Sequence, residues 1–126
     1  MFDAAIIIPH YNDAERLHRC LEALWPQLRP EVELIVIDNA SSDDLSSLQT
    51  NWPDLRIVLE PQKGAASARN RGVAETTAAR LFFLDCDCVP AVDWLDCALT
   101  FADRGDIIGG AVSVFDETPA PRSGAE

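Results

Sequence analysis

The sequence is poor in basic residues. Ten lysines and arginines, of which Lys63 is the only lysine, stand against 21 aspartates and glutamates, and the formal net charge is −11. Nucleic acids and anionic lipids attract positively charged proteins, so neither is expected as a general partner. An anionic ligand would need a metal ion or a local group of arginines to offset this charge.

Long apolar runs and export signals are also missing. No segment approaches the roughly 20 apolar residues of a membrane-spanning helix, although 48% of the chain is hydrophobic. The chain starts Met-Phe-Asp, without the basic residues that open a secretory signal. We therefore expect a cytoplasmic globular domain, either complete or a piece of a larger protein.

The cysteines do not have the spacing of a zinc site. The four, Cys20, Cys86, Cys88 and Cys97, include no C-x-x-C pair. Without an export signal, reduced thiols are the expected state. A metal–thiolate site at Cys86 and Cys88, on either side of Asp87, is an alternative that the pattern leaves open.

Apolar runs and helical patterns alternate along the chain. Strands are predicted at residues 4–9, 32–37, 56–59, 80–84 and 106–115, and a polar loop or tail at 116–126. Helices are predicted between the strands. The alternation predicts an α/β fold with a mainly parallel sheet and right-handed crossovers, in which residues 1–115 form one domain.

The expected helices differ in how they begin and in what they bury. Asn12 or Asp13 is expected to cap the first helix, Ser41–Asp43 the second, and Pro90 is expected in the first turn of the last. The third helix, from Gly64, is so rich in small residues that we expect it to pack very close to the sheet or to a ligand. The inner faces are predicted at Leu17, Cys20, Leu21 and Leu24 in the first helix and at Val92, Leu95, Leu99 and Ala102 in the last.

Three further polar residues are given no role in the site. His10 is expected to be a solvated loop residue, and His18 to lie on the exposed side of the first helix. Arg71 is expected at the surface, solvated or in a salt bridge. None of them enters the candidate site.

The most informative feature is the hydrophobic run at residues 81–84, which ends in Asp85-Cys86-Asp87. It predicts a buried parallel strand that delivers two carboxylates to the C-terminal edge of the sheet, where α/β proteins bind ligands. Two neighbouring carboxylates repel unless a cation lies between them. The oxygen-binding ions Mg²⁺ and Mn²⁺ are the candidates, and either would carry a diphosphate. A pair of solvated turn aspartates is the alternative.

Polar residues follow three of the predicted strands. They are Tyr11-Asn12, Asp38-Asn39 and Asp85-Asp87, and their convergence on one edge predicts a single site. The glycine-rich dinucleotide fingerprint and the Walker lysine motif are both absent, so the commonest nucleotide signatures do not apply.

With these strand ends in view, the chain closely resembles the family-2 glycosyltransferases of the GT-A fold. Four motifs occur in the order and spacing of that family and span about residues 4–115. They are Ile6 to Asn12, Glu33 to Asp43, Gly64 to Gly72 and Phe83 to Pro90. The resemblance implies a Rossmann-like αβα sandwich, here truncated after about five strands.

The resemblance also implies residues that bind a nucleotide sugar. Tyr11 would lie against the nucleobase, in a pocket shaped by Pro9, and Asp38 and Asn39 would bind the base edge and ribose. Many members carry a second aspartate where Asn39 stands, so the identity of the base stays open. The full set is Pro9, Tyr11, Asn12, Asp38, Asn39, Lys63, Arg69, Asp85 and Asp87.

The diphosphate and metal would lie at the other side of the site. Arg69, with Lys63 as a second candidate, would reach the diphosphate. Asp87 would bind the metal ion, Mn²⁺ or Mg²⁺, and Asp85 would bind the metal's water shell or the ribose. All of these roles are implied by the resemblance.

The implied reaction moves a sugar from a nucleoside diphosphate sugar to an acceptor hydroxyl, on a glycan or lipid-linked glycan. Inverting members use a carboxylate base in an acceptor-binding half that lies beyond the length of this chain. We therefore expect nucleotide binding with little transfer by this chain alone. Apolar residues near Ile107, Ile108 and Val112 favour self-association as a homodimer. Any membrane attachment is expected in segments beyond the donor half.

Two other functions fit parts of the pattern. Residues 85–89 match the D-x-D-x-[TV] loop of haloacid-dehalogenase-like phosphatases, but that loop follows the first strand and needs a later lysine. A non-catalytic nucleotide-binding or interaction domain, derived from a glycosyltransferase, is the second. A receiver-like domain is excluded, because Pro9-His10-Tyr11 stands where its acidic pair belongs.

Overall fold

The protein is built on a parallel sheet. The structure, a computed structural model, describes residues 2–102. All strand pairings in this part are parallel. The strands are β1 (Ala4–His10), β2 (Val32–Asp38), β3 (Arg56–Leu59) and β4 (Arg80–Phe83), in the order β3-β2-β1-β4. The predicted α/β fold is confirmed.

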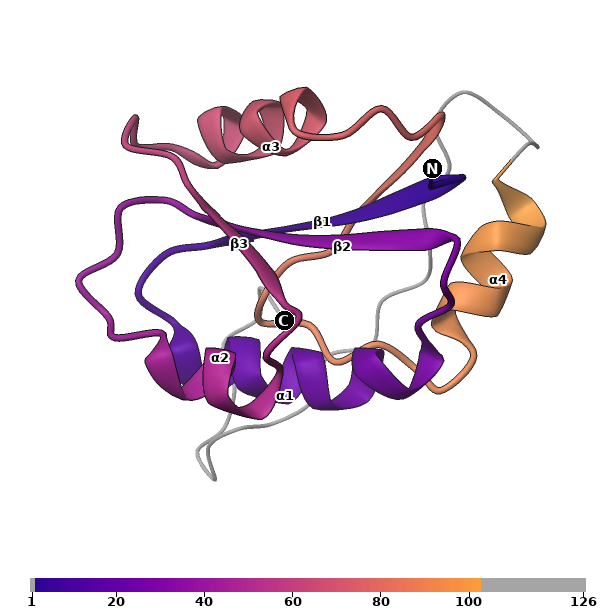
Figure 1. Cartoon of the computed structure of the whole chain (residues 1–126), viewed down its shortest axis with the longest axis horizontal. Helices are drawn as coiled ribbons and strands as arrows, with labels where there is room; N and C mark the ends of the chain where they lie inside the picture. Colours follow the sequence, from indigo (N-terminus) through magenta and orange to yellow (C-terminus); the bar gives the residue numbers. More distant parts are fainter. Residues whose placement is uncertain (1, 103–126) are drawn as a thin grey trace, which may run out of the picture.

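Helices cover both faces of the sheet (Figure 1). On one face lie α1 (Ala14–Leu24), the 3₁₀ turn η1 (Trp25–Gln27) and α2 (Ser46–Asn51); α3 (Ala65–Ala74) lies on the other. The last helix, α4 (Trp94–Phe101), is held next to η1. There the Gln27 side chain accepts the Leu95 N–H at 2.9 Å and donates to the Ala91 carbonyl at 2.7 Å.

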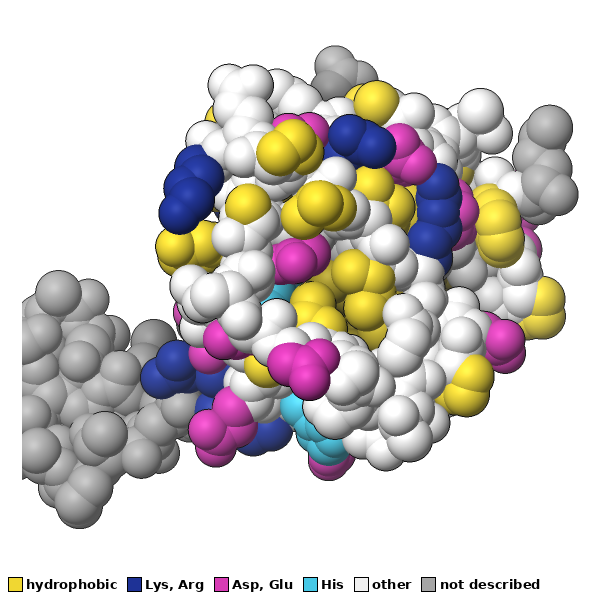
Figure 2. Space-filling view, turned by 60° about the vertical axis from the view of Figure 1, so that its left-hand side comes forward, with side chains coloured by type: hydrophobic (Ala, Val, Ile, Leu, Met, Phe, Trp, Pro, Cys, Tyr) yellow, Lys and Arg dark blue, Asp and Glu magenta, His cyan; other side chains and the backbone are white. Residues whose placement is uncertain are grey.

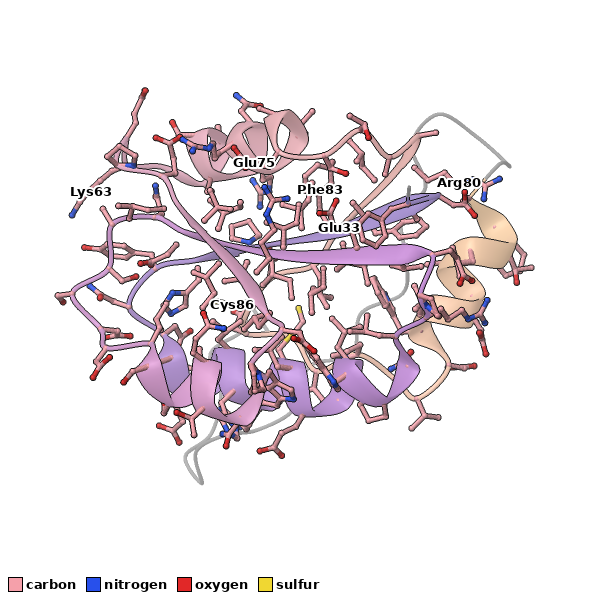
Figure 3. All side chains as sticks on the ribbon, in the orientation of Figure 1. Glu33, Lys63, Glu75, Arg80, Phe83 and Cys86 are labelled. Carbon is pink, nitrogen blue, oxygen red and sulfur yellow. The ribbon has the colours of Figure 1, made fainter. Side chains whose placement is uncertain are left out.

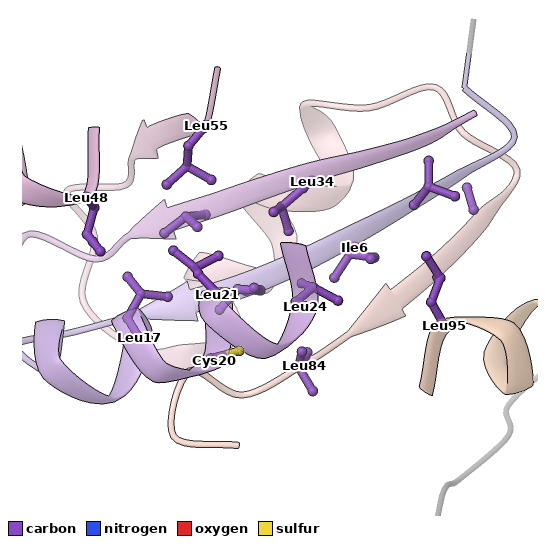
Figure 4. Packing of buried hydrophobic residues seen from close by; sticks show 14 residues of the cluster. Ile6, Leu17, Cys20, Leu21, Leu24, Leu34, Leu48, Leu55, Leu84 and Leu95 are labelled. Atoms are coloured by element: carbon purple, nitrogen blue, oxygen red, sulfur yellow. The ribbon is translucent and has the colours of Figure 1, made fainter. Parts of the chain in front are cut away.

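The middle strand, β1, belongs to two hydrophobic cores. Ile6 and Ile8 face the apolar side of α1, whose residues Leu17, Cys20, Leu21 and Leu24 are all fully buried as predicted (Figure 4). Ile7 points to the opposite face and packs with Ala68 of α3. Side chains alternate between the faces of a strand, so a continuous apolar run fills both layers.

Helix α3 lies very close to the sheet, as its small residues predict. Ala68 and Gly72 are buried, and a Cβ atom built on Gly72 would overlap the Ile7 side chain. A glycine at this point allows the backbone of α3 to rest directly on β1.

Two predictions about the last part of the described chain are wrong. Pro90 precedes α4, which begins at Trp94, and Val92 is 93% exposed rather than part of an inner face. The chain forms a turn between these points, with Trp94 N–H bonded to the Ala91 carbonyl at 3.0 Å. A proline signals that a helix can start nearby, and it does not fix the first residue.

The strand that precedes Asp85 is less buried than predicted. Within residues 2–102, β4 pairs with β1 alone, and Phe83 is 46% exposed. An apolar run reports the hydrophobicity of a strand and not its number of neighbours. The predicted fifth strand (106–115), the tail (116–126) and the residues expected to self-associate lie outside the described residues.

Within the described part of the chain, every helix is too short or too polar to cross a lipid bilayer.

Candidate functional site

The C-terminal edge of the sheet is a topological switch point. The chain builds β1, β2 and β3 outward in one direction and then returns to place β4 on the free side of β1. In such sheets the crevice beyond the strand ends, where the order reverses, is the usual ligand site. The loops after β1 and β2 lie on the left-hand side of Figure 1. The turn after β4 follows the same end of the sheet, because β4 runs parallel to β1.

Strands β1 and β4 separate at Pro9. The last bond between them runs from the Leu84 N–H to the Ile7 carbonyl at 3.1 Å. Residues two apart on a strand face the same neighbour, so Pro9 faces β4 but has no N–H to donate. Beyond this point residues 85–88 form a turn, closed by a 3.0 Å bond from Cys88 N–H to the Asp85 carbonyl.

His10, the last residue of β1, is buried, which corrects its prediction as a solvated loop residue. Only 1% of it is exposed. Its Nδ1 lies 3.3 Å from Asp38 Oδ1 and 3.4 Å from Ser41 Oγ, and its Nε2 accepts the Asp13 N–H at 2.9 Å. The sequence signal that could have revealed its burial is its place at the end of a buried apolar strand.

The predicted helix caps are also replaced by contacts between loops. Asp43 Oδ2 accepts the Ala14 N–H at 3.1 Å and so caps α1, whereas the Asp13 side chain pairs with Arg16. The Asn12 side chain accepts backbone N–H groups of Ser42 and Asp43 at 2.8 and 3.2 Å. Asn12 therefore fixes the loop after β2, and Asp43, one of the residues expected to cap α2, caps α1 instead.

Asn39 ties the loop after β3 to the end of β2. Its side-chain NH₂ donates to the carbonyls of Glu60 and Gln62 at 3.1 and 2.8 Å, and its Oδ1 accepts the Gly64 N–H at 2.8 Å. The residue is only 6% exposed. Both of its donors are engaged within the protein, so Asn39 holds the loop that carries Lys63.

Tyr11 and Lys63 form an exposed pair at the tip of this edge. Lys63 Nζ donates to the Tyr11 hydroxyl at 3.0 Å and lies 4.8 Å from the centre of its ring. Figure 3 shows Lys63 at the outer end of the loop before α3. Tyr11 is 48% exposed, so its ring is accessible to a ligand.

Arg69 and Arg71, both on α3, form different contacts. Arg69 Nη2 lies 3.5 Å from Asp85 Oδ1, with both side chains well exposed. Arg71 instead forms ion pairs with Glu60 and Glu75, as predicted for a residue outside the site.

Asp85 and Asp87 come together with Cys88. One ligand atom from each of the three residues lies within 4.8 Å of the others. Carboxylate oxygens are suitable ligands for Mg²⁺ or Mn²⁺. Burial, followed by the charges of Asp87 and Asp85, raises the pKa of the Cys88 thiol, so without a cation the thiol is neutral at pH 7.

Cys86 points away from this group. Figure 3 shows it on the side of the sheet that α1 covers, where it packs against the core that contains Cys20. Burial raises the pKa of Cys86 to about 11 and that of Cys20 to about 12. The metal–thiolate alternative needed both Cys86 and Cys88. Of these two thiols, only that of Cys88 lies in the group with Asp85 and Asp87.

Two surface pockets lie away from this edge. One of about 330 Å³ is lined by Phe2, Trp25 and Asp54, and one of about 550 Å³ lies between the end of α1 and the segment before α4. Neither includes a candidate site residue. Figure 2 brings the C-terminal edge forward and shows acidic, basic and hydrophobic side chains interspersed on it.

Comparison with known proteins identifies close relatives. The family model described as Glycosyl transferase family 2 matches residues 5–124. The glycosyltransferase AglE of Haloferax volcanii is 38% identical over 117 residues, which cover 86% of this chain and 38% of that protein. The succinoglycan biosynthesis protein ExoO of Rhizobium meliloti is 29% identical over 115 residues, covering 89% and 32%.

Solved structures share the same fold. The mannosyltransferase PcManGT from Pyrobaculum calidifontis, in complex with GDP-Man and Mn²⁺, has a TM-score of 0.70 at 28% identity and covers 80% of this chain. TarS 1–349 of S. aureus has a TM-score of 0.70 at 23% identity over 82% of this chain, which shows that the two share a fold. The chain spans 32–38% of the length of these relatives. By sequence and by its GT-A fold, the chain belongs to glycosyl transferase family 2.

Proposed function

We propose that the C-terminal edge of the sheet binds a nucleoside diphosphate sugar, the donor for transfer of a sugar to an acceptor hydroxyl. The observation that carries this proposal is the grouping of Tyr11, Asp38 and the Asp85–Asp87 turn around one switch point. PcManGT, which has the same fold, is described with GDP-Man and Mn²⁺. Binding sites in open α/β sheets lie at this position.

The nucleoside part is proposed to bind between the ends of β1 and β2. The exposed ring of Tyr11 offers a flat apolar surface for the base, and Pro9 shapes the strand end beside it. Asp38 is half-buried and offers its carboxylate to the ribose or the base edge. Asn12 and Asn39 act by holding the loops around this carboxylate.

The diphosphate is proposed to bind beside the Asp85–Asp87 turn. Arg69 already lies at this turn, and a guanidinium can contact two phosphate oxygens at once. Arrival of the diphosphate would give Arg69 a second anionic partner besides Asp85. Lys63 adds a second positive charge at the same edge.

A divalent cation is proposed to be held by Asp87 and Asp85. Their carboxylates fit Mn²⁺ or Mg²⁺, and Cys88 lies close enough to be a further ligand. When bound, the ion would neutralise charge that develops on the departing diphosphate. The protein's own part is to hold the carboxylates and Arg69 in place.

We propose that residues 2–102 supply the donor half of the reaction. In this part of the chain, no carboxylate is marked by burial or contacts as the base that would take the acceptor's proton. We expect residues 2–102 by themselves to bind nucleotide with little or no transfer. The proposed acceptor is a glycan or lipid-linked glycan. The four free cysteines fit the reducing cytoplasm as its location.

Calorimetric titration of UDP, GDP and dTDP, with and without Mn²⁺, tests the proposal. Binding of one nucleotide that needs Mn²⁺ and is lost in Asp87→Ala supports it. Asp54→Ala is the control, because Asp54 is an exposed aspartate that lines the pocket of Phe2 and Trp25. Absence of binding by wild-type protein with normal circular dichroism would overturn it.

A further inference from the structure

His10 contacts several separate segments at this edge. It ends β1, bonds to Asp38 at the end of β2, reaches Ser41 in the following loop and accepts a bond from Asp13 at the start of α1. Its side chain is fully shielded from solvent. A buried imidazole with partners on both nitrogens is held in one orientation.

The contacts determine which nitrogen carries the proton. The partner of Nε2 is a backbone N–H, which can only donate, so Nε2 must keep its lone pair. The single proton of a neutral imidazole then lies on Nδ1. There it faces Asp38 Oδ1 at 3.3 Å and Ser41 Oγ at 3.4 Å.

The second carboxylate near the ring does not change this assignment. Asp43 Oδ2 lies 3.9 Å from Nε2, but it accepts the Ala14 N–H at 3.1 Å. A proton on Nε2 would face the Asp13 N–H, and one of the two donors would lose its acceptor. Retaining that bond leaves Nε2 as the acceptor and places the ring proton on Nδ1.

We propose that His10 is a positioning residue that orients the Asp38 carboxylate for the nucleotide. The Nδ1 proton and the Ser41 N–H, at 3.4 Å, are both directed to Oδ1 of Asp38. These two bonds set the plane of the carboxylate without using Oδ2, which remains for a ligand. The hydrogen bonds of His10 form without a ligand, whereas their effect on the affinity for nucleotide rests on the proposed function.

The geometry is tested first, without nucleotide, by two-bond ¹H–¹⁵N NMR of the histidine rings in the full chain. Comparison with His18→Gln assigns the signals of His10. The expected result is the Nδ1–H tautomer, with a protected ring proton that shifts in Asp38→Ala and stays in place in Asp44→Ala. An Nε2–H tautomer, or a ring proton unaffected by Asp38→Ala, would overturn the inference.

The consequence is tested by a double-mutant cycle on affinity for the nucleotide that calorimetry selects. His10→Ala is expected to weaken binding about tenfold, and to have no further effect in the Asp38→Ala background. His10→Asn, which keeps an N–H near the position of Nδ1, should recover part of the affinity. His18→Ala should bind as wild type does, because His18 contacts Asn51 and Trp52 rather than a site residue.

The proposed function and the proposed role of His10 can fail separately. If wild-type protein binds no nucleotide, the proposed function fails, and the NMR result alone decides whether His10 orients Asp38. If wild-type protein binds and the His10 and Asp38 effects simply add, His10 acts by another route and the inference is wrong. Circular dichroism and thermal unfolding of each variant show whether it is folded.

Discussion

Asn39 holds Gly64 in place by accepting its backbone N–H at 2.8 Å, across 25 positions in the sequence. The same side chain donates two bonds to the strand-to-helix loop that leads to Gly64. Gly64 has a φ of 123°, which glycine adopts far more readily than other residues. This one amide therefore sets the course of the loop between β3 and α3, and with it the position of Lys63.

Asn39→Asp is expected to destabilise the protein, although the two side chains have almost the same shape. Aspartate cannot donate to the Glu60 and Gln62 carbonyls, and its charge would face them in a buried place. A loss of about 1–3 kcal/mol in the free energy of unfolding is expected. Urea unfolding measures it, with Asn70→Asp, an exposed position on α3, as control. Equal losses in the two variants would contradict this role of Asn39.

Gly72→Ala is expected to be destabilising through its contact with β1. The added methyl group would overlap Ile7, and overpacking of this kind costs about 1–3 kcal/mol. Because the two residues touch, combining Gly72→Ala with Ile7→Ala should cost less than the sum of the single changes. Additive losses in thermal or urea unfolding would show that α3 does not rest on Ile7.

Arg69→Gln is expected to weaken the binding of a nucleoside diphosphate and to leave binding of the nucleoside unchanged. A charged hydrogen bond to phosphate is worth about 1.5–3 kcal/mol, or roughly tenfold or more in affinity. Calorimetry with both ligands measures the difference. Arg29→Gln is the control, since Arg29 pairs with Asp96 near η1. A similar loss for both ligands would show that Arg69 does not act on the diphosphate.

The buried thiols predict that stability falls in alkaline solution. Burial raises the pKa of Cys20 from 9.0 to about 12. Between these values the folded protein keeps a proton that the unfolded chain has lost, so the stabilisation present below pH 9 is lost as pH rises towards 12. Urea unfolding at pH 8 and pH 10 should show a smaller decline in Cys20→Ala than in wild type. The same decline in both would rule out Cys20 as its source.

More of the fold than of the site could be predicted from the sequence. The apolar run of β1, the inner face of α1 and the small residues of α3 report directly on packing, and all three predictions are confirmed. The chain order of strand ends was also enough to predict that Asp38 and Asp85 approach one edge. These patterns are local, and a single sequence displays them.

The loop contacts could not be predicted, because they join residues about 20 to 30 positions apart. Asp43 caps a helix that precedes it by 29 residues, and His10 is buried by partners from the next strand and loop. Local capping rules favour Asn12 and Asp13, since those rules consider neighbouring residues alone. The number of neighbours of β4 likewise depends on tertiary structure, which the Leu81–Leu84 run does not encode.

The central claim is that a nucleotide and a divalent cation bind together at the C-terminal edge of the sheet. Paramagnetic broadening by Mn²⁺ tests it most directly, in ¹H–¹⁵N spectra of the full chain with the nucleotide selected by calorimetry. We predict loss of the amide signals of Asp85, Asp87 and Tyr11, with those of Trp25 and Asp54 at the opposite edge retained. Broadening centred on Trp25 and Asp54, or spread evenly over the protein, would contradict the assignment of the site.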